Sequence, residues 1–178
     1  MEKNRQGLLH IYCGDGKGKT SAAVGLAVRA AGCGMKVLVV RFLKTENSGE
    51  VEVLRSIPGS TVTPCDRTFG FVFRMTDEQK QEAALYYQSR FEAAAEEAVQ
   101  GEYDLLVLDE ILASCNYGMV RETSVVEFLK NRPEKLEVVL TGRNPSETFL
   151  ELADYVSEIR MRRHPYEKGI PARRGIEF

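Results

Sequence analysis

A short glycine- and lysine-rich segment, GDGKGKT at positions 14–20, constrains the fold of this chain more than any other feature. It stands between an apolar, strand-like run at 8–13 and a small-residue, helix-like run at 21–31. Glycines let the backbone wind around an anion with its N–H groups pointing inward, and the following helix brings the positive end of its dipole to the same place. We therefore expect a phosphate-binding loop between the first strand and the first helix.

The segment differs at one position from the P-loop pattern G-x-x-x-x-G-K-[ST], because Cys13 stands where the pattern has its first glycine. The end of the pattern, Gly18-Lys19-Thr20, is intact. In such loops the lysine lies along the polyphosphate and the hydroxyl reaches Mg²⁺. The alternative is a glycine-rich turn that binds nothing; the strand before it and the helix after it favour the P-loop.

The composition indicates one globular unit with an uneven charge distribution. With 178 residues, 43% of them hydrophobic, the chain can bury one core, so we expect a single domain over 1–178. Its last part, 160–178, is a basic tail with six Lys or Arg against two Glu. The formal net charge of −2 gives no electrostatic case for binding nucleic acid or an anionic membrane.

The cysteines and the N-terminal residues point to a cytoplasmic protein. No C-x-x-C pair occurs, which argues against a zinc knuckle and favours reduced thiols. The polar start MEKNRQG does not resemble a signal peptide, and no apolar run approaches the ~20 residues of a membrane helix. The four cysteines are Cys13, Cys33, Cys65 and Cys115.

Short apolar runs alternate with longer helical patterns, which is typical of an α/β fold with a mostly parallel central sheet flanked by helices on both faces. Six strands are expected, at 8–13, 36–43, 61–64, 104–109, 136–141 and 155–159. The first, second, fourth and fifth are rich in Val, Leu and Ile without alternation, so we expect them to be central.

Four helices are expected, at 20–31, from Thr76 to Gly101, from about Ser124 to the residue before Pro133, and one opening with Asn144-Pro145. Thr76 with Gln79 forms a capping-box pattern, and Asn144-Pro145 reads as an N-cap followed by proline in the first turn. The long helix presents one apolar face, formed by Ala84, Tyr87, Phe91, Ala95 and Ala98.

Two carboxylates, Asp109 and Glu110, end the fourth strand, at the Walker-B position where a carboxylate holds Mg²⁺ directly or through water. The alternative is a strand that ends in solvated acids.

Arg143 follows the fifth strand in Thr-Gly-Arg and could donate two hydrogen bonds to a phosphate, although a surface arginine in a turn fits equally. Arg29 could bind nucleotide or complement the C-terminal dipole of its own helix.

Three phenylalanines lie close together in Phe69-Gly70-Phe71-Val72-Phe73, a loop before the long helix. Leaving each in water forgoes about 1.5 to 3 kcal/mol, so the loop is either an apolar wall for a large planar ligand or a segment packed into the core. His10 and His164 are not placed for a metal site or a catalytic dyad.

A series of motifs follows the phosphate loop in order. They are RFLK (41–44), GFVF (70–73), LDE (108–110), NRP (131–133), LTGR (140–143), ELADYVSEI (151–159) and KGIPARRGIEF (168–178). Together, over nearly the whole chain, they resemble the P-loop-type ATP:corrinoid adenosyltransferases that act on cob(I)alamin or cob(I)yrinic acid a,c-diamide.

The resemblance implies a RecA-like P-loop NTPase fold, usually in a homodimer, and Mg²⁺-ATP, or Mn²⁺-ATP, as the adenosyl donor. It implies that Co(I) of a corrinoid (cobalamin, cobinamide or cobyrinic acid a,c-diamide) attacks the C5′ carbon of ATP and that the whole triphosphate leaves. A reduced flavoprotein is the expected electron donor. No nucleic acid or membrane is implied as a partner.

The resemblance also implies roles for particular residues. Lys19 and Glu110 are the expected catalytic groups at the phosphates, together with Phe71 and Phe73 as the aromatic pair beneath the corrin. Thr20, Asp109 and Glu110 are expected to hold the metal. The expected nucleotide-binding residues are Gly14, Asp15, Gly16, Lys17, Gly18, Lys19, Thr20, Ser21, Arg29 and Arg143.

The chain departs from the family in two ways. Some relatives have tryptophan where this chain has Phe73, and the chain contains no tryptophan. Some relatives also carry an N-terminal extension over the partner's active site, whereas here the first strand is expected almost at once. Two other functions remain open from the residues alone: a P-loop phosphotransferase such as a nucleoside kinase, which would make ADP, and a binding module that consumes neither ATP nor corrinoid.

Overall fold

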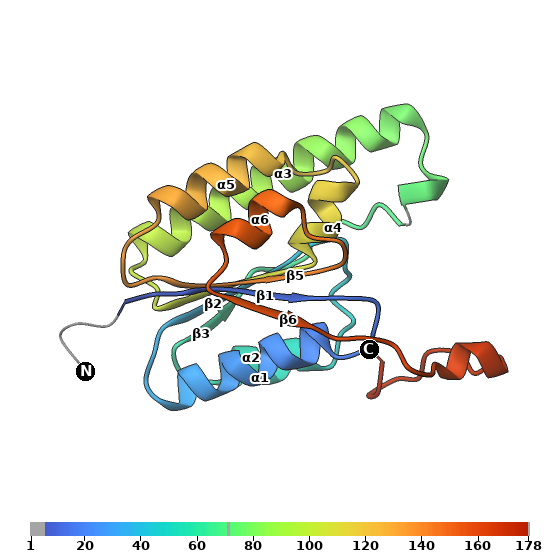
Figure 1. The fold of residues 1–178 in the computed structure, drawn as a ribbon, viewed down its shortest axis with the longest axis horizontal. Helices are drawn as coiled ribbons and strands as arrows, with labels where there is room; N and C mark the ends of the chain where they lie inside the picture. The colour runs from blue at the N-terminus through green and yellow to red at the C-terminus, as the bar shows by residue number, and fades with distance from the viewer. Residues whose placement is uncertain (1–5, 71, 178) are drawn as a thin grey trace.

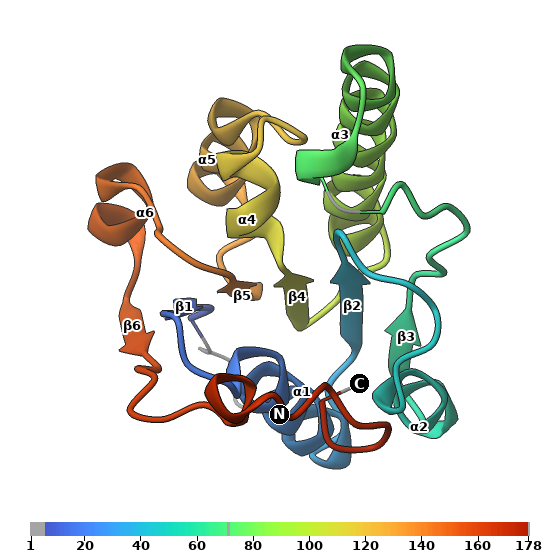
Figure 2. The ribbon, with the colours of Figure 1, turned by 90° about the vertical axis from the view of Figure 1, so that its right-hand side faces the viewer.

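The computed structural model describes residues 6–70 and 72–177. Its centre is a six-stranded sheet in the order β3-β2-β4-β5-β1-β6, and every neighbouring pair is parallel. Figure 2 shows this order edge-on. The strands are β1 (Leu9–Cys13), β2 (Val37–Arg41), β3 (Ser60–Val62), β4 (Leu105–Asp109), β5 (Glu137–Thr141) and β6 (Tyr155–Glu158). The predicted α/β class is confirmed.

Helices cover both faces of the sheet, as Figure 1 shows, with α1 and α2 on one side and α3, α4, α5 and α6 on the other. The α-helices are α1 (Lys19–Gly32), α2 (Glu50–Ser56), α3 (Asp77–Gln100), α4 (Ile111–Asn116), α5 (Glu122–Asn131) and α6 (Glu147–Leu152). Two short 3₁₀ helices are η1 (Val72–Arg74) and η2 (Pro165–Lys168). Among the described residues, no helix has the length and apolar character needed to cross a membrane.

The prediction of four central strands is confirmed. β2 and β4 are buried along their whole length, and β1 and β5 lie beside them in the sheet. β3 and β6 form the two edges, and all four residues of β6 are exposed. The continuous apolar runs therefore mark the strands that are covered by helices on both faces.

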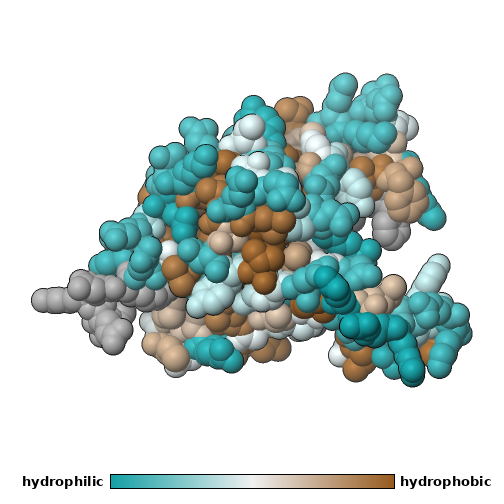
Figure 3. Space-filling view, viewed as in Figure 1, coloured by the Kyte–Doolittle hydropathy of each residue, from teal (hydrophilic) through white to brown (hydrophobic). Residues whose placement is uncertain are grey.

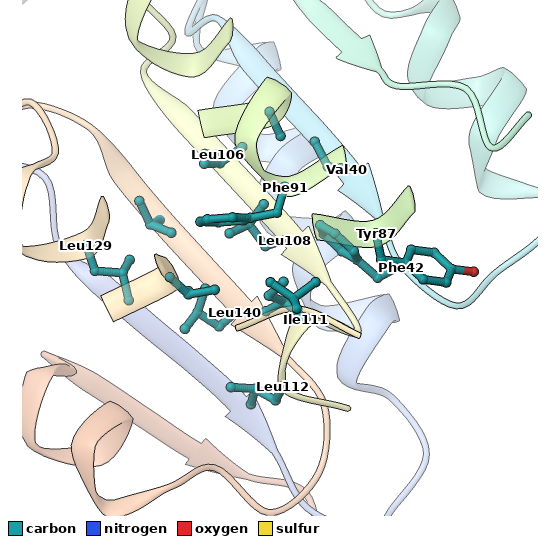
Figure 4. Close-up of a cluster of buried hydrophobic side chains, with 14 of the residues drawn as sticks. Val40, Phe42, Tyr87, Phe91, Leu106, Leu108, Ile111, Leu112, Leu129 and Leu140 are labelled. Atoms are coloured by element: carbon teal, nitrogen blue, oxygen red, sulfur yellow. The ribbon is translucent and has the colours of Figure 1, made fainter. Parts of the chain in front are cut away.

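Two hydrophobic clusters lie on opposite faces of the sheet. The larger one packs α3, α4 and α5 against the strands, and Figure 4 shows Phe91 of α3 pointing toward Leu106 and Leu108 of β4, with Tyr87 beside Phe42. The smaller cluster packs the alanines of α1, with Val51 and Leu54 of α2, against the other face. Small side chains let α1 lie close to the sheet, which places the start of that helix beside the carboxyl ends of the strands.

The capping box at Thr76 and Gln79 is confirmed at the start of α3. The predicted buried face of α3 needs a small correction: Ala83 and Ala94 are buried, whereas Ala84 and Ala95 pack only at the edge of the core. Residues three or four positions apart share one face of a helix, and the buried residues follow this spacing: Ala83, Tyr87, Phe91, Ala94 and Ala98.

The predicted start of the last helix is wrong. Asn144 has φ 48°, in the left-handed region, and the N-cap of α6 is Ser146, whose hydroxyl accepts a hydrogen bond from Phe149 N at 3.4 Å. The side chain of Asn116 donates to the carbonyl oxygens of Arg143 and Asn144, so this loop is shaped by α4. In addition, α5 begins two residues before the expected Ser124, and the short helices α2 and α4 were not predicted.

The tail after β6 turns back across the carboxyl edge of the sheet. It runs past the start of α1, and its end lies near that helix in both ribbon views. Figure 3 shows its surface as mostly hydrophilic, at the lower right. A parallel sheet brings the carboxyl ends of its strands to one edge, where ligands bind in open α/β folds, and the tail lies at that edge.

We predict that Phe91→Ala destabilises the fold much more than Leu85→Ala on the same helix. Phe91 is 2% exposed and lies in the larger cluster, whereas Leu85 is 75% exposed. The free energy of unfolding, measured in urea, should fall by about 3–5 kcal/mol for Phe91→Ala and by about 0.5 kcal/mol or less for Leu85→Ala. Similar losses for the two variants would contradict the described packing of α3.

Candidate active site at the carboxyl edge of the sheet

The loop at 14–20 joins β1 to α1 as predicted, and its glycines are required by geometry. Gly14 has φ 107° and Gly18 has φ 123°, conformations that side-chain-bearing residues rarely adopt. A Cβ on Gly14 would lie 2.3 Å from the carbonyl oxygen of Ile159, which follows β6. Gly16 N donates to the same oxygen at 2.8 Å, so one loop N–H is used to dock the segment after β6.

Lys19 is buried within the loop that it follows. Its Nζ donates to the carbonyl oxygens of Gly14 and Gly16, each at 2.8 Å. Burial lowers the pKa of Lys19, and the positive charge of Arg143 lowers it further. Arg143 reaches over from the end of β5, with Nη2 3.5 Å from the carbonyl oxygen of Asp15. Two cations, one at the start of α1 and one in the turn after β5, therefore face the same loop.

Asp109 is the most enclosed acidic group of the site, at 1% exposure. Its Oδ1 accepts hydrogen bonds from Thr141 Oγ1 at 2.6 Å and from Thr20 Oγ1 at 3.0 Å. The first helical turn after the phosphate loop, β4 and β5 thus meet at one carboxylate. The predicted neighbourhood of Thr20 and Asp109 is present in the structure.

Glu110 adopts φ 63°, a left-handed conformation that is uncommon for a residue with a side chain and costs strain. Its backbone N donates to Thr141 Oγ1 at 2.8 Å, which holds this turn at the start of α4. Burial raises the pKa of Glu110, and the charge of Asp109 raises it further; Lys44 and Lys19 act in the opposite direction. The charges of Asp109, Lys44, Lys19 and Arg143 therefore all act on Glu110.

Lys44 is a site residue whose role was not predicted from the sequence. Its Nζ donates to Thr20 Oγ1 at 2.8 Å and also contacts the Asp109 carboxylate. Leu43 before it has φ 53°, so the chain turns sharply after β2 and brings Lys44 over the phosphate loop. The motif RFLK contained this lysine, but a single lysine after a strand carries no signal of its own.

The remaining predicted nucleotide-binding residues lie in different places. Ser21 is exposed in the first turn of α1, beside Thr20, and lines a surface hollow with Thr20 and Lys44. Arg29 lies in the last turn of α1, about 15 Å along the helix axis from Lys19. The structure does not bring Arg29 to the phosphate loop, and its position suits the alternative role of complementing the helix dipole.

Lys17 is exposed and pairs with the tail. Its Nζ lies 3.0 Å from Oε1 of Glu177, which also accepts from Arg173 at 3.1 Å. Hydrogen bonds from Arg173 and Lys17 lower the pKa of Glu177 to about 2. The tail and the phosphate loop together line a cavity of about 600 Å³, and four arginines of the tail are among its lining residues. The ion pair between Lys17 and Glu177 itself was not predicted from the sequence.

The phenylalanines of the aromatic loop (residues 69–73) do not all lie in the same environment: one is packed into the core and another is at the surface. Phe69 packs into the core, with ring centroids 5.5 Å from Tyr86 and 5.8 Å from Tyr87. Phe73, on η1, is 78% exposed. Phe71 lies outside the described residues. Phe69 therefore anchors the loop, and Phe73 lies at the surface, with the Arg74 guanidinium 5.5 Å from its ring centroid.

Comparisons with known proteins identify the family of this chain. A family profile described as ATP:corrinoid adenosyltransferase BtuR/CobO/CobP matches residues 5–178. The chain belongs to this family. It is 34% identical to the corrinoid adenosyltransferase of Escherichia coli K12, over 99% of this chain and 88% of that protein. It is 33% identical to the corrinoid adenosyltransferase of Pseudomonas aeruginosa, over 99% of this chain and 86% of that protein.

A third relative, corrinoid adenosyltransferase CobA of Salmonella typhimurium, is 32% identical over 99% of this chain and 88% of that protein. The matches span the phosphate loop, the end of β4 and the tail alike. The resemblance seen in the motifs is therefore confirmed as membership of the family over the whole chain.

We predict that Glu110→Gln stabilises the protein at pH 8 and that the gain disappears near pH 4. The raised pKa means that the ionised carboxylate is disfavoured in the folded state, so wild-type stability is lost as the pH rises through that pKa. Below the ordinary value of about 4.3, the acid is protonated whether folded or unfolded. Thermal unfolding at both pH values checks this, with exposed Glu127→Gln as the control; an equal gain at both pH values would contradict it.

Proposed function

We propose that this protein transfers the 5′-deoxyadenosyl group of ATP to the Co(I) centre of a corrinoid and releases triphosphate. In this reaction the Co(I) electron pair forms a bond to C5′, the C5′–O bond breaks, and the bonding electrons leave with the triphosphate. Membership of the family supports the reaction class. The supporting observation in the structure is the meeting of Lys19, Arg143 and the Thr20–Asp109 pair around one glycine loop.

This reaction requires the protein to stabilise negative charge on the leaving triphosphate. Lys19 and Arg143 face the loop from two sides, and Lys17 is an exposed residue of the loop itself. Positive groups that are already in place stabilise a departing polyphosphate without reorganising during the reaction. We assign the triphosphate to this loop, with the nucleoside directed toward the aromatic loop so that C5′ can meet the cobalt.

The residues at Thr20 and Asp109 fit a divalent cation, Mg²⁺ or Mn²⁺. A hydroxyl oxygen and a buried carboxylate together hold the ammonium group of Lys44, which shows that this place favours positive charge. Oxygen ligands of this kind suit hard cations, and Glu110 stands beside them. A cation bound there would supply further positive charge to the phosphates.

We assign the corrinoid to the aromatic loop. Phe73 is exposed on η1, while Phe69 fixes the same loop to α3. A rigid apolar surface beneath the corrin would disfavour water or a nitrogen base as the lower ligand of cobalt, which makes Co(II) easier to reduce. Phe71 is proposed to share this role on the basis of the sequence motif.

A homodimer, a reduced flavoprotein as electron donor and a cytoplasmic location complete the proposal, each from the family resemblance stated above. The natural corrinoid can be cobalamin, cobinamide or cobyrinic acid a,c-diamide.

The test of the proposal is an anaerobic incubation of the protein with Mg²⁺-ATP and chemically reduced cob(I)alamin. We expect a light-sensitive alkyl-cobalt spectrum and one triphosphate per adenosyl group transferred. ADP with no change at cobalt would overturn the proposal in favour of a kinase or ATPase. Binding of both ligands with neither consumed would overturn it in favour of a binding module.

We predict that Lys19→Ala lowers the rate of adenosyl transfer by at least about 100-fold, because one charged donor to the leaving triphosphate is lost. Lys17→Ala should cost less, since Lys17 is exposed and already paired with Glu177. Single-turnover rates with pre-reduced cob(I)alamin measure both. A larger loss for Lys17→Ala than for Lys19→Ala would contradict the assignment of Lys19.

We also predict that Phe73→Ala lowers activity from Co(II) more than activity from chemically pre-reduced Co(I), with little change in stability. Phe69→Ala is the matched control, because it should lower the melting temperature by loss of its contacts with Tyr86 and Tyr87. Parallel assays from the two cobalt states separate the roles. Equal losses from Co(II) and Co(I) in Phe73→Ala would argue against a role in ligand displacement.

A further inference from the structure

The ammonium group of Lys44 lies at the place assigned above to a divalent cation. Its Nζ is 2.8 Å from Thr20 Oγ1 and contacts Oδ2 of Asp109. Thr20 Oγ1 and Asp109 also bond to each other at 3.0 Å. The two oxygen groups that suit a metal are therefore bridged by a side-chain cation from the same protein.

The charge of Lys44 has a clear role in this position. Asp109 is 1% exposed, and an ionised carboxylate buried without a counter-charge is strongly disfavoured. Two nearby cations are engaged elsewhere: Lys19 donates to Gly14 and Gly16, and Arg41 donates to Thr45 and Glu46. Among the described residues, Lys44 is the cation that forms an ion pair with Asp109.

The side chain of Lys44 also has room to move away from Thr20 and Asp109. It belongs to the connection between β2 and α2, and its side chain keeps 25% of its surface exposed. It lines an open hollow of about 440 Å³ beside Thr20 and Ser21, which Glu50 and Glu177 also line. A change of rotamer would move the ammonium into this hollow, toward two carboxylates, without moving a strand.

We propose that Lys44 is a built-in counter-ion that occupies the divalent-cation site of the nucleotide-free protein and moves out when the metal arrives with ATP. The inference rests on the proposed function and adds to it an order of binding. A bare divalent cation would meet the positive charge of Lys44, because like charges at this separation repel. ATP brings negative charge that offsets this repulsion, so metal and nucleotide bind together. Lys44 is thus a positioning residue.

The test is Mn²⁺ binding without nucleotide, measured from the EPR signal of free Mn²⁺. We expect wild-type protein to bind Mn²⁺ weakly. Lys44→Met and Lys44→Gln remove the charge at similar length and should bind Mn²⁺ at least tenfold more tightly. Lys44→Arg, which keeps the charge, and Lys80→Met, on the exposed face of α3, should behave as wild type.

Two further measurements locate the effect. Adding Asp109→Asn to Lys44→Met should abolish the gained affinity, because the gained site includes this carboxylate. In EDTA, the melting temperature of Lys44→Met should fall below that of wild type, and Mn²⁺ should restore it. Mn²⁺ without nucleotide should barely move the melting temperature of wild type.

Tight nucleotide-free Mn²⁺ binding by wild type would overturn the inference, and so would unchanged affinity in both neutral variants. Gained affinity that survives Asp109→Asn would overturn it as well, because the metal would then lie elsewhere. None of these measurements uses ATP or corrinoid. Failure of adenosyl transfer with wild type would therefore count against the proposed function alone, and failure of the Mn²⁺ series against Lys44 alone.

Discussion

The buried carboxylate of Asp109 is the constraint on which the rest of the site depends. An ionised group at 1% exposure is tolerated only if hydrogen bonds and opposite charge surround it. Here Thr20 comes from the start of α1, Thr141 from the end of β5 and Lys44 from the turn after β2. One carboxylate at the end of β4 thus sets the relative positions of four segments at the carboxyl edge of the sheet.

The backbone turns at Glu110 and Gly142 also position charged groups at this edge of the sheet. The left-handed turn at Glu110 aims its N–H at Thr141 and brings a second acidic group to the edge. Gly142 has φ 147°, and a Cβ there would lie 2.7 Å from Leu112 Cβ, so the turn that presents Arg143 requires glycine. Close packing of the Gly142 turn against α4 therefore positions Arg143 at the same edge of the sheet as Glu110.

The fold was largely predictable from the sequence, because continuous apolar runs mark covered parallel strands and the capping box at Thr76 is a local signal. The phosphate loop and Asp109 were predictable for the same reason, since the loop directly follows β1 and Asp109 is the last residue of β4. Lys44 was not, because its role depends on a turn at Leu43 and on a partner 65 positions away. The start of α6 was mispredicted because contacts from α4 override the local Asn-Pro signal.

The most direct measurement uses ATP labelled with ¹⁸O at the oxygen that bridges C5′ and the α-phosphorus, with mass spectrometry of the phosphate products after a single turnover on cob(I)alamin. Breaking the C5′–O bond leaves the label in free triphosphate, and we expect labelled triphosphate in one-to-one ratio with new alkyl-cobalt. Label retained in a nucleotide, as ADP or AMP, would mean that a phosphorus–oxygen bond breaks instead and would contradict the account.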